Sequence, residues 1–82
     1  MYGQYSRLVA YILVNVEVGA EGDVRDEIVR RFNKAVTEAR IVYGEFDIVV
    51  RVEVDTMKAL ESVISGIRSI DGVRRTTTLI AV

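Results

Sequence analysis

The chain repeats one pattern of elements in its two halves, and this repeat limits its fold more than any other feature. The segment VEVG at residues 16–19 corresponds to VEVD at residues 52–55. The same spacing aligns Val24 with Leu60. In each half, apolar residues first alternate and then recur every three or four positions, which predicts a strand followed by a helix. The sequence therefore predicts two strand–helix–strand units.

The first half predicts a strand over residues 8–18, ended by Gly19, and a helix that begins near Asp23. The strand's core-facing side would carry Ile12, Val14, Val16 and Val18. Asp23 is a suitable cap for the free amides of the first helical turn. The helix's apolar stripe would be Val24, Ile28 and Phe32, with Asp26–Arg30 and Glu27–Arg31 as ion pairs on its wet side.

Two further strands are predicted over residues 36–43 and 46–54, joined by Gly44 and Glu45. A two-residue loop with glycine first suits a type II′ turn, which needs a positive φ at that glycine. On one face, this register pairs Tyr43 with Phe46, Ile41 with Ile48, Ala39 with Val50 and Thr37 with Val52. On the other face, it pairs Val42 with Asp47, Arg40 with Val49 and Glu38 with Arg51. The last of these is an opposite-charge pair, which supports the register.

A second helix is predicted from a cap at Asp55 to about Ile70, followed by a strand over residues 73–82. Its stripe would be Leu60, Val63, Ile64 and Ile67. Two adjacent right-handed crossovers give a ferredoxin-like α+β sandwich, with a four-stranded antiparallel sheet and two helices on one face. We expect one domain over residues 8–82, preceded by a flexible N-terminus over residues 1–7.

The sheet face turned away from the helices is predicted to be more apolar than a surface that meets water. Its apolar residues would be Val9, Tyr11, Leu13, Val42 and Val49, with some of Thr76, Thr78, Ile80 and Val82. Scattered apolar residues are normal on a surface, but these concentrate on the first strand. That concentration, in a chain that is 50% hydrophobic, favours a dimer formed through the sheet.

Composition excludes several classes of chemistry. The 82 residues contain no cysteine and no histidine, which removes disulfides, thiolate nucleophiles and the commonest general base and metal ligand. A net charge of −1 gives no electrostatic case for nucleic acid or an anionic membrane. The apolar run at residues 8–14 is too short to span a bilayer and lacks a signal-peptide pattern. We expect a cytoplasmic protein that is not an enzyme and has no cofactor.

Two polar clusters remain to be interpreted. Glu45 and Asp47 are close in sequence, but nothing local forces their carboxylates to converge as a catalytic pair would require. Arg74 and Arg75 could contact phosphate, although a charged start of an edge strand, which protects against aggregation, is the favoured interpretation.

Nearly the whole chain, from about Leu8 to Val82, resembles the effector-binding (RAM) domain of the Lrp/AsnC transcription regulators. The most specific parts of the resemblance are GEFD at residues 44–47 and the ending GVRRTTT at residues 72–78. The resemblance implies dimerisation through the sheet, further assembly into a tetramer of dimers (an octamer), and amino-acid effectors bound between dimers. It implies effector-binding roles for Tyr43, Gly44, Glu45, Asp47, Thr76 and Thr78.

One departure from the family is the short stretch before the first strand, which leaves no room for the helix-turn-helix of full-length members. We therefore expect a module without its own DNA-binding domain. It could sense an amino acid, join a full-length Lrp/AsnC relative in a mixed assembly, or serve an enzyme of amino-acid metabolism. The alternative from a different class is a ferredoxin-like structural or assembly module with no ligand, in which Asp47 completes turn hydrogen bonds.

Overall fold

The computed structural model describes residues 7–82. Its elements are β1 (Leu8–Val16), α1 (Glu21–Arg31), β2 (Val36–Ile41), β3 (Ile48–Val54), α2 (Met57–Arg68) and β4 (Val73–Ile80). The predicted βαββαβ order is confirmed. The prediction of a flexible N-terminus over residues 1–7 lies outside the described residues, apart from Arg7. The guanidinium of Arg7 donates to the carboxylate of Asp55 at 3.1 Å.

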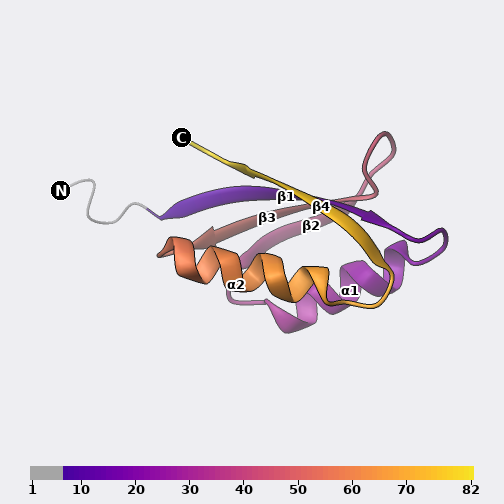
Figure 1. Ribbon diagram of the computed structural model, residues 1–82, viewed down its shortest axis with the longest axis horizontal. Helices are drawn as coiled ribbons and strands as arrows, with labels where there is room; N and C mark the ends of the chain where they lie inside the picture. The colour runs from indigo at the N-terminus through magenta and orange to yellow at the C-terminus, as the bar shows by residue number, and fades with distance from the viewer. Residues whose placement is uncertain (1–6) are drawn as a thin grey trace.

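The four strands form one antiparallel sheet in the order β2-β3-β1-β4, so the strands of each half interleave with those of the other. Both helices lie against the same face of the sheet, and the opposite face is left bare (Figure 1). The β2–β3 connection projects beyond the sheet at one end, next to the β1–α1 and α2–β4 connections. This is the predicted ferredoxin-like α+β architecture.

The core fills the space between sheet and helices and contains only apolar side chains among the buried residues. Strand β3 illustrates the cause, because Ile48, Val50, Val52 and Val54 are buried while the residues between them are half-buried. That alternation follows from the two-residue repeat of a strand. The helices add Val24, Ile28, Leu60, Val63 and Ile67. Apart from Val18, the predicted core positions are thus confirmed, with Phe32 and Ile64 packed at the margin of the core.

The first strand is shorter than predicted, because it ends at Val16 instead of residue 18. The amide of Glu17 donates to the carbonyl of Gly72, and the amide of Ala20 turns back to the carbonyl of Glu17. These bonds start the turn into α1 and leave Val18 99% exposed, so its predicted place in the core is wrong.

Both predicted helix caps are wrong by a short distance. Helix α1 begins two residues before Asp23, after Ala20, which makes no side-chain cap bond. Asp23 instead lies in the first turn, where its negative charge interacts favourably with the positive end of the helix dipole. Helix α2 is capped by Thr56, whose Oγ1 accepts a hydrogen bond from the amide of Ala59 at 3.0 Å. Asp55 is occupied by its ion pair with Arg7.

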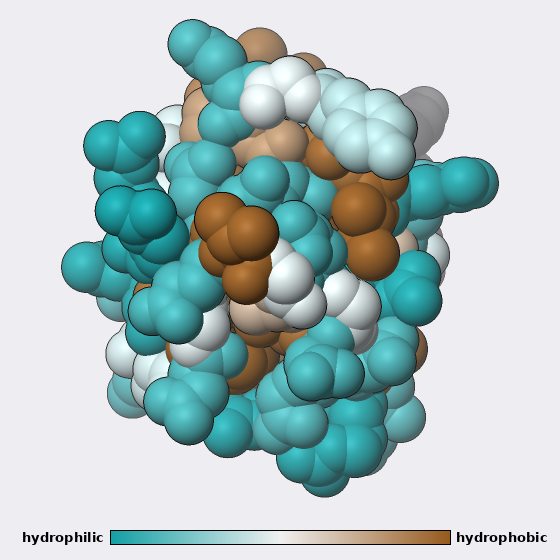
Figure 2. Space-filling model, turned by 90° about the vertical axis from the view of Figure 1, so that its right-hand side faces the viewer, coloured by the Kyte–Doolittle hydropathy of each residue, from teal (hydrophilic) through white to brown (hydrophobic). Residues whose placement is uncertain are grey.

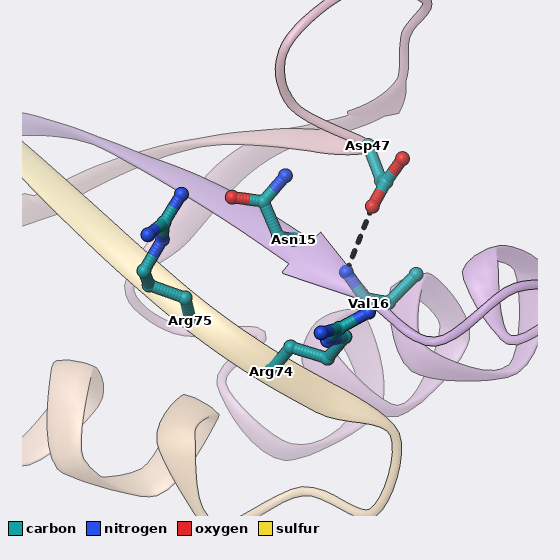
Figure 3. A pocket seen from close by; sticks show the side chains of 5 residues that line it. All are labelled: Asn15, Val16, Asp47, Arg74 and Arg75. Carbon is teal, nitrogen blue, oxygen red and sulfur yellow. Dashed lines mark hydrogen bonds between the residues drawn. The ribbon is translucent and has the colours of Figure 1, made fainter.

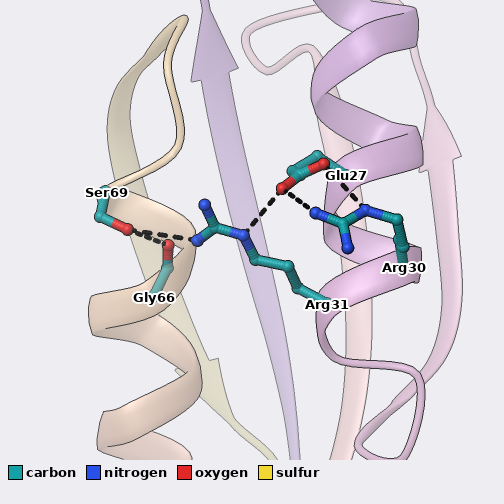
Figure 4. A network of polar contacts seen from close by, with 5 residues as sticks. All are labelled: Glu27, Arg30, Arg31, Gly66 and Ser69. Atoms are coloured by element: carbon teal, nitrogen blue, oxygen red, sulfur yellow. Dashed lines mark hydrogen bonds and ion pairs between the residues drawn. The ribbon is translucent and has the colours of Figure 1, made fainter.

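One carboxylate organises the charges on α1 and links the two helices (Figure 4). Glu27 pairs with Arg30 at 2.6 Å and with Arg31 at 2.8 Å. Arg31 also donates to Ser69 Oγ beyond the end of α2 at 3.5 Å. The hydrogen bonds from Arg30 and Arg31 lower the pKa of Glu27 below its ordinary value. The predicted Glu27–Arg31 pair is confirmed. The predicted Asp26–Arg30 pair is wrong, because Asp26 pairs with Arg25.

The predicted β2–β3 register is confirmed from Glu38↔Arg51 to Ile41↔Ile48. It fails at Thr37, because Val36 is the residue opposite Val52 and Thr37 is an extra residue in a bulge. The Oγ1 of Thr37 donates to the carbonyl of Arg51 and accepts from its guanidinium. The charges pair along the strands, Arg40 with Glu38 and Arg51 with Glu53, both at 2.6 Å, and not across the ladder.

The connection between these strands is longer than the predicted two residues. Strand β2 ends at Ile41 and β3 begins at Ile48. The amide of Val42 donates to the carbonyl of Asp47 at 2.9 Å, but Tyr43 and Phe46 do not continue the ladder. Gly44 has the predicted positive φ, at +131°.

The bare face of the sheet carries a different set of β4 residues from the predicted one. Thr78 is opposite Ile12 and Thr76 is opposite Val14, and directly opposed residues share a face. Thr76, Thr78 and Ile80 therefore lie on the helix side. Val82 lies beyond the end of β4. The bare face instead receives Thr77 and Leu79, which are opposite Leu13 and Tyr11.

Candidate functional site

The clearest polar pocket lies where β1 ends and where β3 and β4 begin. Its volume is about 470 Å³, and its lining residues are Asn15, Val16, Asp47, Arg74 and Arg75. Figure 3 shows that these side chains come from three segments far apart in the sequence. Strand pairing brings the segments together, because β1 is hydrogen-bonded to β3 on one side and to β4 on the other. We call this the polar pocket.

A bulge in β4 shapes the polar pocket. Asn15 is opposite Arg75, but the next residue of β1, Val16, is opposite Val73. Arg74 is therefore an extra residue on β4. In a regular strand, consecutive side chains point to opposite faces, and a bulge breaks that alternation. As a result, both guanidiniums line the same pocket.

Asp47 is fixed by backbone contacts to β1. Its Oδ2 accepts a hydrogen bond from the amide of Val16 at 2.8 Å, and its own amide donates to the carbonyl of Val14 at 2.9 Å. The Val16 amide faces β3 but lies beyond Val14↔Ile48, where the β1–β3 ladder ends, so it takes this side-chain acceptor. Asp47 therefore ties β3 to β1, and its second carboxylate oxygen accepts no hydrogen bond from the residues that the structure describes (Figure 3).

Asn15 links the polar pocket to the β2–β3 connection. Its Nδ2 donates to the carbonyl of Glu45 at 2.8 Å. Its Oδ1 is buried and has no hydrogen-bond partner within residues 7–82. Buried acceptors in native proteins normally have a partner, so this oxygen is an exception among the described residues.

The two arginines of the polar pocket differ from most others in the chain. Ion pairs to carboxylates hold Arg7, Arg25, Arg30, Arg31, Arg40 and Arg51. Neither Arg74 nor Arg75 forms an ion pair or a side-chain hydrogen bond to any residue that the structure describes. With Asp47 as the only carboxylate, the lining carries two positive charges and one negative charge.

The structure brings together only part of the predicted site. Asp47 lines the polar pocket, and Glu45 joins it through a backbone carbonyl that accepts from Asn15. Gly44 and Tyr43 lie in the exposed connection, with Tyr43 fully exposed at 104%. Thr76 and Thr78 are not in the lining, because the β4 register turns them toward the helices.

Sequence reasoning missed Asn15, Arg74 and Arg75 as pocket residues. A signal for Asn15 was present, since it is an amide inside an otherwise apolar strand. The sequence favours interpreting the arginine pair as a charged edge, and the bulge that gathers both side chains leaves no local mark in the sequence.

Figure 2 shows that this end of the molecule is largely hydrophilic, with separate apolar spots.

Other chemistry finds less support in the described residues. Residues 7–82 contain no cluster of three or more side chains suited to hold a metal ion. No helix of the described chain has the length and hydropathy needed to cross a bilayer. A second hollow of about 450 Å³ lies on the bare sheet face, and its lining residues are Tyr11, Glu38, Arg40, Ile41, Val42, Val49 and Arg51.

Solved structures of small proteins match the fold along most of the chain. A hypothetical protein, PHS023 from Pyrococcus horikoshii, is 37% identical with a TM-score of 0.82, and the match covers 92% of this chain and 89% of that one. FFRP-DM1 is also 37% identical, with a TM-score of 0.83 and coverage of 92% and 99%. No curated protein matches the sequence.

Transcription regulators match over part of their length. AsnC from E. coli is 26% identical with a TM-score of 0.69, and the match covers 90% of this chain and 50% of AsnC. The regulator NMB0573 of Neisseria meningitidis, solved as an L-Met complex, is 21% identical with a TM-score of 0.77 and coverage of 92% and 49%. The family model of the Lrp/AsnC ligand binding domain matches residues 9–82. The chain therefore belongs to the Lrp/AsnC ligand-binding domain family.

Proposed function

We propose that this protein is an amino-acid-binding and assembly module that serves the regulation of transcription or of amino-acid metabolism, and that the polar pocket holds the effector. The observation that carries the proposal is the meeting of Asp47, Asn15, Arg74 and Arg75 in one cavity. A zwitterion needs acceptors for its ammonium group and donors for its carboxylate. The second oxygen of Asp47 and the unpartnered Oδ1 of Asn15 supply acceptors, and the free guanidiniums supply donors.

The names of two matched proteins agree with this proposal. One matched regulator was solved with L-Met, and another is AsnC. The matches cover 50% of AsnC and 49% of NMB0573, and the family model identifies residues 9–82 as a ligand-binding domain. Contact with DNA would therefore be made from outside the described residues, for instance by a full-length relative in a mixed assembly.

The proposal includes assembly through the bare sheet face. Leu13 lies at its centre, opposite Val49 of β3 and Thr77 of β4. Tyr11 is 37% exposed and Leu79 is 52% exposed on the same face. A second copy that covered this surface would bury apolar area that a small domain cannot bury by itself. Dimers that then associate edge to edge, toward an octamer, would close the polar pocket at their contacts.

The deciding experiment compares wild type with Asp47→Asn in calorimetric binding of the twenty amino acids, with the oligomer mass measured in parallel. Asparagine keeps an acceptor for the Val16 amide but removes the charge that would hold an ammonium group. We expect at least about a tenfold loss of affinity, since a hydrogen bond to a charged group contributes about 1.5–3 kcal/mol. The matched control is Asp23→Asn on α1, which should bind as wild type does.

A second function, a structural module without a ligand, is favoured by one observation. Asp47 already has a partner in the Val16 amide, so its structural role can be explained without an effector. If no amino acid binds wild type at millimolar concentration, or if Asp47→Asn loses its oligomer mass while affinity is unchanged, the structural function replaces the sensing one.

A further inference from the structure

The polar pocket carries more positive charge than an ordinary amino acid can neutralise. Arg74 and Arg75 contribute two guanidiniums without ion-pair partners among the described residues, against one carboxylate at Asp47. An amino acid with a neutral side chain is a zwitterion of zero net charge. Such a ligand would satisfy one guanidinium and leave the other beside it without an anionic partner. A ligand with one extra negative charge would make the pocket neutral.

From this balance we propose that the effector is a dicarboxylic amino acid of the aspartate and glutamate class, and that Arg74 and Arg75 select it. The inference rests on the proposed function, since it names the class of ligand that the same pocket takes. Arginine is suited to the task because its planar guanidinium binds a carboxylate through two parallel hydrogen bonds.

The bulge provides two anion positions and not one. If β4 were regular, Arg74 and Arg75 would point to opposite faces of the sheet. The extra residue at Arg74 turns both side chains into the pocket while their backbone positions remain one residue apart. In Figure 3 the Arg75 guanidinium lies on the side of Asn15 and that of Arg74 lies on the side of Val16. Each guanidinium could then bind one carboxylate of the ligand.

The lining offers little to an apolar effector. Most small-molecule sites are lined predominantly by hydrophobic side chains. In the polar pocket only Val16 is apolar, and the other lining residues are Asn15, Asp47 and the two arginines. The side chain of leucine or methionine would gain little burial there, whereas a second carboxylate would find a charged donor. The polarity of the lining and its charge balance thus point to the same class of ligand.

The ammonium group has its own place in this arrangement. Asp47 presents a carboxylate oxygen that is not used by Val16, and Asn15 holds an acceptor that has no partner. The Asn15 oxygen is buried, so the carboxamide would have to rotate and give up the Nδ2 bond to the Glu45 carbonyl to present that oxygen to the ligand. A dicarboxylate without an amino group would leave both acceptors without a donor, so it should bind more weakly than the matching amino acid.

The test measures dissociation constants by calorimetry for L-glutamate and L-aspartate, for their amides L-glutamine and L-asparagine, for glutarate and for L-leucine. Each amide has the shape of its acid without the second charge. We expect each acid to bind wild type at least about tenfold tighter than its amide. One of Arg74→Gln and Arg75→Gln should reduce that ratio to near one, and the other should weaken acid and amide alike. Arg68→Gln on α2, which also removes an arginine without an ion pair among residues 7–82, should change neither.

The outcomes separate this inference from the function on which it rests. If the amides or L-leucine bind wild type as tightly as the acids, the pocket senses amino acids but the dicarboxylic class is wrong. If both arginine variants keep the full acid-to-amide ratio, or change only the oligomer mass, the arginines pair with another copy of the chain and do not select the ligand. If glutarate binds as tightly as L-glutamate, the ammonium position is wrong. If no amino acid binds, the proposed function itself fails.

Discussion

At the scale of single residues, the molecule uses the same groups for folding and for the polar pocket. The carboxylate of Asp47 accepts a hydrogen bond from the Val16 amide, which lies beyond the end of the β1–β3 ladder. The carboxamide of Asn15 holds the carbonyl of Glu45 and thereby the connection that contains Gly44. A substitution in this group therefore changes both the geometry of the β2–β3 connection and the lining of the pocket. Conservative substitutions are needed to separate the two roles.

Two glycines should respond to alanine with opposite signs. Gly44 has a φ of +131°, which an L side chain rarely adopts, so Gly44→Ala should lower the free energy of unfolding by about 1–2 kcal/mol. Gly22 lies inside α1 with open space around it, and alanine there should raise that free energy by up to about 1 kcal/mol. Urea denaturation of both variants measures the difference. Changes of the same sign would contradict the assigned backbone conformation of Gly44.

At the scale of elements, the two helices are held together by a close approach and by a charged bridge. A Cβ added at Gly66 of α2 would overlap with Cζ of Phe32, which follows α1. Phe32 also packs against the core, so its ring has little freedom to move. Arg31 spans the same gap to Ser69 (Figure 4). Since the helices share one face of the sheet, their spacing determines how well both cover the core.

Gly66→Ala should destabilise the protein although alanine is the better helix former. Overpacking costs typically about 1–3 kcal/mol, which exceeds the gain in helix propensity of about 1 kcal/mol. The double variant Gly66→Ala/Phe32→Leu should recover the propensity gain, because the smaller side chain removes the clash. A double-mutant cycle by urea denaturation measures the coupling between the two positions. Additive effects would show that the helices tolerate the extra methyl group without strain.

The bridge at Glu27 should make stability depend on pH in a defined window. Hydrogen bonds from Arg30 and Arg31 lower the folded-state pKa of Glu27 below the ordinary 4.5. Its contribution is therefore present above about pH 4.5 and is lost as the pH falls through the folded-state pKa. Glu27→Gln should lower Tm at pH 7 and have progressively less effect below pH 4.5. The control is Glu61→Gln on α2, because Glu61 forms no ion pair with any residue that the structure describes. A Tm difference independent of pH would contradict the assignment.

At the scale of the whole molecule, the main feature is the sheet face that no helix of the described chain covers. Figure 1 shows the helices confined to one side of the sheet. The other side carries Tyr11, Leu13 and Leu79, flanked by the ion pairs Arg40–Glu38 and Arg51–Glu53. An apolar centre with a charged rim is the usual composition of a protein interface. This arrangement supports the proposal that a second copy of the chain packs here.

Leu13→Lys should shift the protein from dimer toward monomer, because association would bury an unpaired ammonium at the centre of the interface. The same substitution at Val29, which is 42% exposed on α1, should leave the mass unchanged. Light scattering at micromolar concentration measures both. A wild-type protein of monomer mass, or a Leu13→Lys variant of unchanged mass, would place any assembly on another surface.

The sequence by itself determined the order of elements, the fold class and nearly all of the core. Alternation in β1 and β3 and the apolar stripes of α1 and α2 are local patterns, and each depends only on which side of its element faces the interior. Most of the β2–β3 register could also be predicted from the sequence, because a short connection fixes how neighbouring strands align. The exact helix starts were not, because Asp55 and Thr56 compete for one cap and a distant residue, Arg7, engages Asp55.

The pocket was decided by tertiary structure alone. Asn15, Asp47 and Arg75 are separated by about thirty residues at each step, and the pairing of β1 with β3 and β4 brings them together. The bulge at Arg74 then gathers two consecutive arginines on one side and turns Thr76 and Thr78 toward the helices. A bulge places two residues of one strand opposite a single residue of its partner. No periodicity within one strand records that mismatch, so the membership of the pocket became visible only when the strands were paired.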